Sequence, residues 1–148
     1  YMLVGMIHEM REDIPQAQAA YEKVLQLNPR FGPAANNLAY LYSEHGGDKD
    51  KALELAQTAK ELLPEDPRVS DTLGWILYKR GLYERAISLL SESAEKLKEN
   101  AEVYYHLGMA YLKAGKSVEA KDALGKAVKL SEQFPGVEDA KRTLAELK

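Results

Sequence analysis

Apolar residues along the chain recur three and four positions apart in short runs, and turn residues such as Gly81 and Gly115 separate the runs. A helix completes one turn in about 3.6 residues, so this spacing places the apolar side chains on one helical face. The pattern predicts helix pairs at 1–11 with 14–27, 33–45 with 49–63, 67–80 with 83–97, and 101–114 with 117–131.

Small residues repeat with a period near 34 residues. One series, Gly5, Ala39, Gly74 and Gly108, has steps of 34, 35 and 34; a second, Ala17, Ala52, Ala86 and Ala120, has steps of 35, 34 and 34. The extra residue therefore falls between Ala39 and Ala52, where Gly46-Gly47 indicates a turn insertion. Two antiparallel helices that cross closely need Gly or Ala at the crossing, so the period predicts four consecutive helical hairpins.

The end of the chain predicts one more helix. After Phe134-Pro135-Gly136, the segment 137–147 places Val137, Ala140, Leu144 and Leu147 on one stripe. A terminal hairpin leaves an apolar face uncovered, and an amphipathic helix with one such stripe can cover it. We therefore expect residues 135–148 to form a capping helix.

The fourth period contains the stretch Tyr104-Tyr105-His106-Leu107-Gly108-Met109-Ala110-Tyr111, followed by Gly115, Ala120 and Ala127. This pattern resembles the tetratricopeptide repeat (TPR), in which an aromatic residue, Leu-Gly, Tyr and two alanines stand at fixed offsets. The earlier periods keep part of the signature, with departures at Ala39, His8, Leu77 and Lys98. The sequence of residues 73–81 is also similar to repeats of bacterial envelope-associated TPR proteins.

The resemblance implies an all-α fold, an α-solenoid of antiparallel helical hairpins wound as a right-handed superhelix. The expected organisation is one solenoid domain: a first repeat at 1–31 that lacks its opening residues, then repeats at 32–66, 67–100 and 101–134, and the cap at 135–148. Because the chain begins inside a helical pattern, we expect it to be a fragment of a longer protein whose first helix exposes Met2, Val4 and Met6.

In this family a bound peptide lies on the inner, concave wall, which the first helix of each pair builds. The helical period selects the residues that share that face. The predicted peptide-binding residues are Asn36, Asn37, Tyr40, Arg68, Asp71, Thr72, Trp75, Lys79, Tyr105, His106, Met109 and Lys113.

Tyr40, Trp75 and Met109 stand at the same offset in successive repeats. A ladder of large, adaptable side chains suits an apolar or aromatic-bearing ligand. The alternative is that these side chains pack against the neighbouring hairpin. Capture of a C-terminal carboxylate by basic and amide side chains is poorly supported, because only Asn37 occupies an equivalent site.

Charge and composition exclude several classes of partner. The net charge is −3, so no basic excess favours nucleic acid or an anionic membrane surface. No apolar run approaches the roughly 18 residues of a membrane span, which gives no expectation of direct membrane insertion. The absence of cysteine fits a cytoplasmic and a periplasmic or envelope location equally, so the sequence leaves the compartment open.

Nothing in the sequence predicts catalysis, a metal site or a cofactor. His8, His45 and His106 fall in different repeats, and no pair has the spacing of metal ligands. The expected function is therefore non-catalytic protein–protein interaction through the concave groove. The alternative is an assembly module that acts by self-association, as a homo-oligomer through the exposed first helix, or by domain packing.

Overall fold

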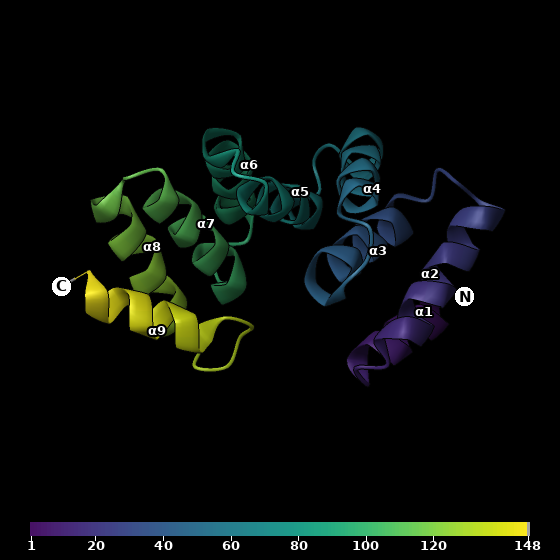
Figure 1. Ribbon diagram of the computed structural model, residues 1–148, viewed down its shortest axis with the longest axis horizontal. Coiled ribbons are helices and arrows are strands. Elements are labelled where there is room, and N and C mark those ends of the chain that lie inside the picture. Colours follow the sequence, from purple (N-terminus) through teal and green to yellow (C-terminus); the bar gives the residue numbers. More distant parts are fainter. Residues whose placement is uncertain (148) are drawn as a thin grey trace. The chain divides into compact units, whose positions relative to one another are not determined.

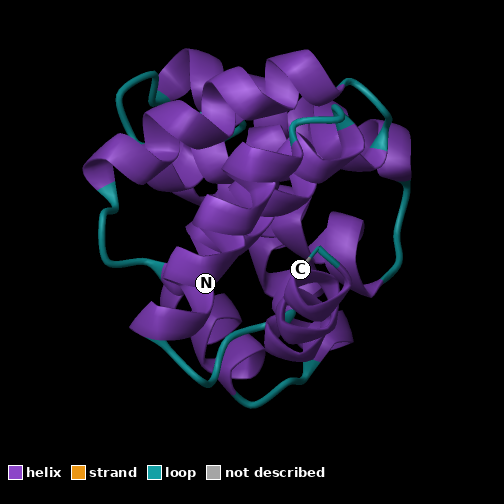
Figure 2. Ribbon diagram, turned by 90° about the vertical axis from the view of Figure 1, so that its left-hand side faces the viewer, coloured by secondary structure: helices purple, strands orange, loops and turns teal. Residues whose placement is uncertain are grey.

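A computed structural model describes residues 1–147, and within them every regular element is an α-helix (Figures 1 and 2). The helices are α1 (Met2–Met10), α2 (Ile14–Leu27), α3 (Gly32–His45), α4 (Lys49–Leu62), α5 (Pro67–Lys79), α6 (Tyr83–Lys96), α7 (Ala101–Lys113), α8 (Ser117–Leu130) and α9 (Val137–Glu146). The predicted helix pairs are confirmed, with ends that differ by one residue in most helices. α9 lies where the capping helix was predicted.

The chain divides into two compact units, Tyr1–Ile76 and Leu77–Lys148, with the division inside α5. In the first unit α1 packs on α2, α2 on α3, and α3 on α4. In the second unit α6 packs on α7, α7 on α8, and α8 on α9. The organisation as a single solenoid domain with the predicted repeat boundaries stays a prediction.

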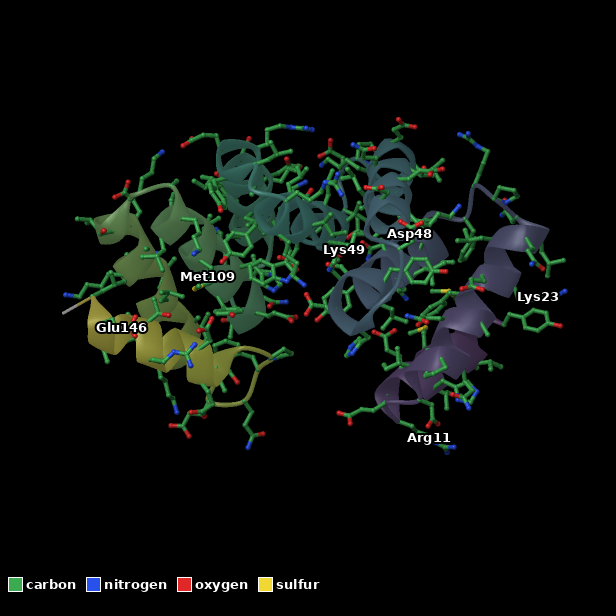
Figure 3. The ribbon with its side chains drawn as sticks, in the orientation of Figure 1. Arg11, Lys23, Asp48, Lys49, Met109 and Glu146 are labelled. Atoms are coloured by element: carbon green, nitrogen blue, oxygen red, sulfur yellow. The ribbon has the colours of Figure 1, made fainter. Side chains whose placement is uncertain are left out.

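Local signals in the sequence account for where the helices begin and end. Asp48 precedes α4 (Figure 3). Its carboxylate accepts hydrogen bonds from the backbone N–H groups of Asp50 and Lys51 at 2.9 and 3.1 Å. Asn100 caps α7 through Val103 N–H at 3.1 Å. The predicted insertion ends α3, because Gly46 follows His45 with φ of 86°, a conformation that glycine adopts without strain.

Alanine and glycine allow the paired helices to approach closely. Ala17, Ala39, Ala52 and Ala120 are at most 1% exposed. A Cβ added to Gly5 would lie 2.6 Å from the Tyr21 ring, and one added to Gly108 would lie 2.6 Å from Leu124 Cγ. The predicted role of the small residues is thus confirmed within the hairpins α1–α2 and α7–α8.

Candidate functional site: the faces of the first helices

Three predicted binding residues, Asn36, Asn37 and Tyr40, are half-buried on α3. Asn37 Nδ2 donates to Tyr21 Oη at 3.3 Å, and Tyr21 Oη donates to Glu9 Oε1 at 2.7 Å. These bonds join α1, α2 and α3. Burial, with the Glu9 carboxylate beside the hydroxyl, raises the pKa of Tyr21 well above its usual value, so the hydroxyl keeps its proton and stays a donor.

Asn36 has no comparable partner. Its Oδ1 is buried and accepts no hydrogen bond from the residues that the structure describes. A buried acceptor without a donor costs roughly 1–3 kcal/mol, because it loses its hydrogen bonds to water. A donor from another molecule would recover part of that cost, provided that the carboxamide turns to meet it.

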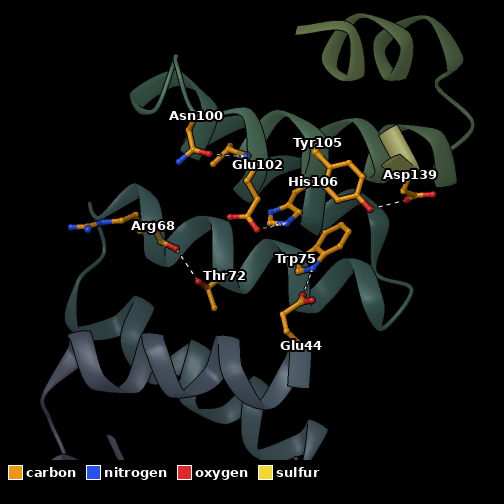
Figure 4. A network of polar contacts seen from close by, with 10 residues as sticks. Glu44, Arg68, Thr72, Trp75, Asn100, Glu102, Tyr105, His106 and Asp139 are labelled. Carbon is orange, nitrogen blue, oxygen red and sulfur yellow. Dashed lines mark hydrogen bonds and ion pairs between the residues drawn. The ribbon is translucent and has the colours of Figure 1, made fainter. Parts of the chain in front are cut away.

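The first turns of α5 carry Arg68, Asp71 and Thr72, and Trp75 follows one turn later. Arg68 is exposed and Asp71 half-buried, whereas Thr72 is 5% exposed and donates its hydroxyl to the Arg68 carbonyl at 3.0 Å. Trp75 is 8% exposed, and its indole N–H donates to Glu44 Oε1 at 2.6 Å (Figure 4). Trp75 therefore joins α5 to the end of α3.

In the second unit the predicted residues of α7 are mostly buried. Tyr105 and Met109 are each 8% exposed, and His106 is 2% exposed with Nε2 3.9 Å from Glu102 Oε2. Tyr105 Oη donates to Asp139 of α9 at 2.8 Å (Figure 4). Lys79 and Lys113, at the ends of α5 and α7, are exposed.

The predicted aromatic ladder is accordingly less open than its spacing suggests. Tyr40 is half-buried, whereas Trp75 and Met109 expose only a small edge to a partner. A helical period identifies which residues share a face but carries no information on how deeply neighbouring elements cover it. The roles of all twelve residues in peptide binding stay predictions.

Two partners of these side chains escaped sequence reasoning. Glu44 accepts a hydrogen bond from the Trp75 indole, and Asp139 accepts one from the Tyr105 hydroxyl. Each pair is more than 30 residues apart in the chain. Charged residues in the last turn of one helix or the first turn of another are common, so nothing in the local pattern marks these two as partners of buried side chains.

Comparison with known proteins identifies the family. The sequence model described as "Tetratricopeptide repeat" matches residues 10–76 and 77–142, which together make up most of the chain. The chain belongs to the tetratricopeptide repeat family. The resemblance in the fourth repeat is thereby confirmed, and so is the α-solenoid fold class. Proteins of this family are protein-interaction and assembly modules, typically non-catalytic scaffolds.

Among relatives of this TPR chain, the TPR repeat-containing protein PA4667 of Pseudomonas aeruginosa is 31% identical over 104 residues, which cover 70% of the chain and 18% of that protein. The Type IV pilus assembly protein PilF of the same organism is 25% identical over 143 residues, covering 93% of the chain and 55% of PilF. The chain thus spans only part of the length of these relatives.

Solved TPR structures agree in fold. A structure of Pseudomonas aeruginosa PilF has a TM-score of 0.78 and 26% identity, covering 99% of this chain and 65% of that one. A structure of MamA has a TM-score of 0.79 and 26% identity, covering 99% and 85%.

Across residues 1–147, no three His, Cys, Asp or Glu side chains are grouped so that they could hold a metal ion. Within the same residues, no helix combines the length and apolarity needed to cross a membrane.

Proposed function

We propose that this chain binds a segment of a partner protein on the face formed by α3 and by the part of α5 up to Ile76. Membership of the TPR family supports an interaction module in general. The observation that favours this face is the carboxamide of Asn36, whose buried Oδ1 has no donor among the described residues. A backbone N–H of a bound peptide supplies a donor of the required kind.

The neighbouring side chains suit a ligand that is both polar and aromatic. Tyr40 presents part of its ring on α3, one turn after Asn36. On α5, Arg68 and Asp71 offer one charge of each sign. Tyrosine is a frequent interface anchor because it buries a large area at little conformational cost. We therefore infer an extended peptide with an apolar or aromatic side chain that lies against Tyr40.

The test is selection of a random peptide library on the purified chain, with Tyr40→Glu and Asn36→Ala as the comparison proteins. Tyr40→Glu puts a charge where the apolar side chain of the ligand would lie. Asn36→Ala removes the proposed acceptor. Trp75 is a poor choice for substitution, because its bond to Glu44 joins two helices and its loss would disturb the fold.

The expected result is enrichment of aromatic-bearing peptides that bind Tyr40→Glu and Asn36→Ala at least about fivefold more weakly, a loss of roughly 1 kcal/mol. Gln57→Ala, an exposed change on α4, is the matched control and should bind like the parent chain. Enriched peptides that bind all four proteins equally would show that this face is not the binding surface.

A second candidate function, self-assembly, is favoured by the apolar surface of α1. Leu3, Val4, Met6, Ile7 and Met10 are between 40% and 84% exposed. Contiguous exposed apolar residues are typical of interaction sites. If two copies pair through α1, sedimentation should show a dimer at tens of micromolar that Met6→Glu with Met10→Glu converts to monomer. A strict monomer over the same range would contradict this candidate.

A further inference from the structure

A cleft in the first unit lies between α2 and α4, with α3 at its floor, and has a volume of about 490 Å³. Its lining residues differ from the predicted peptide-binding set. Ala35, Leu38 and Tyr42 of α3 form the floor, and Leu25 of α2 and Leu55 of α4 flank it. The cleft is therefore largely apolar in its interior, and its size is within the range of sites that hold a small ligand or a few side chains.

The cleft has the form of a groove along two helices. Its residues on α2 run from Glu22 to Gln26, with Pro29 just beyond the end of that helix, and those on α4 run from Lys51 to Thr58. The α4 wall is thus about two helical turns, or roughly 10 Å, in length. A groove of this kind fits an amphipathic helix whose apolar residues recur at i, i+3 or i+4, and i+7.

An equivalent cleft recurs in the second unit. Its floor is Tyr104, Leu107 and Tyr111 of α7, each 69 residues after its counterpart in the first cleft. The wall on α8 carries Asp122 and Lys126, each 68 residues after Glu54 and Thr58. Lys126 Nζ lies 5.7 Å from the centre of the Tyr104 ring and so covers part of that floor.

The walls of both clefts carry more carboxylates than cations. The first has Glu22 and Glu54 against Lys51, and Glu22 accepts the hydroxyl proton of Tyr42 in a hydrogen bond. The second has Glu119 and Asp122 against Lys126, which pairs with Asp122 at 3.4 Å. Each apolar floor therefore has a net negative rim, which is complementary to lysine or arginine at the edges of a bound segment.

We propose that the α2–α3–α4 cleft docks an amphipathic helix of a partner protein that carries leucine-sized residues on one face and lysine or arginine beside them. This surface is separate from the face of Asn36 and Tyr40. A chain with both surfaces binds two protein segments at the same time. The α7–α8 cleft offers the same kind of floor with its lysine folded over it.

The test uses a phage library of helical peptides of about 14 residues, or four turns, with random residues on one face and random charge on its flanks. Peptides selected on the parent chain are then measured by fluorescence anisotropy against Tyr40→Glu and three further variants. Thr58→Trp fills the cleft from the α4 wall, and Glu54→Lys reverses a rim charge. Glu61→Lys makes the same reversal on an exposed α4 residue that does not line the cleft.

The expected peptides have apolar residues at helical spacing and basic flanks. Thr58→Trp should weaken binding at least tenfold and Glu54→Lys about fivefold, whereas Glu61→Lys and Tyr40→Glu should stay within twofold. If circular dichroism shows that Thr58→Trp is unfolded, the comparison of peptide binding by Glu54→Lys with binding by Glu61→Lys decides the test. The proposal is overturned if no peptide is enriched or if the enriched peptides are acidic. It is also overturned if Glu54→Lys leaves binding unchanged, or if Tyr40→Glu weakens it.

Discussion

Gly108 and Gly125 lie on the two helices of one hairpin but have opposite surroundings. A Cβ at Gly108 would meet the Leu124 side chain at 2.6 Å, whereas one at Gly125 would meet nothing within 4 Å. We expect Gly108→Ala to lower the free energy of unfolding by about 1–3 kcal/mol through overpacking. Gly125→Ala should raise it by about 0.5–1 kcal/mol, because alanine loses less backbone entropy in a helix.

Urea denaturation followed by circular dichroism measures both changes. The two substitutions are chemically identical and 17 residues apart. A general effect of replacing glycine by alanine would therefore change the free energy of unfolding in the same direction at both sites. Equal signs would contradict the packing assigned to α7 and α8.

Trp75 forms a polar link between α5 and α3. Trp75→Phe keeps most of the ring but removes the N–H that donates to Glu44. We expect it to destabilise the chain by about 1–2 kcal/mol, because a bond to a charged acceptor is worth more than an average one. Glu44→Gln keeps an acceptor oxygen and should cost less. A double-mutant cycle measures the coupling, and a coupling near zero would refute the link.

The stability of the chain at alkaline pH should depend on the protonation of Tyr21. Burial, together with Glu9, raises its pKa in the folded chain above the unfolded value of 10.0. The folded state therefore binds this proton more tightly, and the associated stability is present below pH 10 and lost as pH rises above it. Tyr21→Phe should flatten the fall in melting temperature between pH 10 and 11. An unchanged slope would show that other groups control alkaline unfolding.

At the scale of elements, α9 packs on α8, and we expect it to stabilise the second unit as a cap. Ala140 is 0% exposed on its packed face, and Ala145 is exposed on the same helix. Ala140→Glu should lower the melting temperature by several degrees, because it buries an unpaired charge. Ala145→Glu is the matched control and should change it little. Equal melting temperatures, measured by differential scanning calorimetry, would contradict the capping role.

The elements themselves were predictable from the sequence. The 34-residue period, the insertion at Gly46-Gly47 and the apolar stripe from Val137 specify the helices nearly to the residue. Each of these signals is local, or repeats at a fixed step, so a single sequence carries it.

Depth of burial was not predictable in the same way. Tyr40, Trp75 and Met109 share one offset, yet Tyr40 is half-buried while the other two are 8% exposed. What differs is the set of elements around each position, such as the Glu44 carboxylate that meets Trp75. The α2–α3–α4 cleft escaped prediction for a related reason, since the helical period gives no sign that its floor residue Tyr42 stays only half-buried.

At the scale of the whole molecule, the chain is a TPR array with two proposed surfaces for protein segments. The first-helix face around Asn36 and Tyr40 and the α2–α3–α4 cleft both belong to the first unit. The second unit contributes the buried Tyr105 and the helix α9, whose Asp139 accepts the hydrogen bond of its hydroxyl. This division predicts that peptide binding depends mainly on residues before Ile76.

The most direct measurement of the central claim is amide hydrogen exchange of the chain with and without a peptide enriched by the library selection. We expect the peptide to slow exchange in segments of α3 and in α5 up to Ile76, and to leave exchange in α9 unchanged. Protection confined to the second unit, or spread evenly over all helices, would contradict binding on the Asn36 and Tyr40 face.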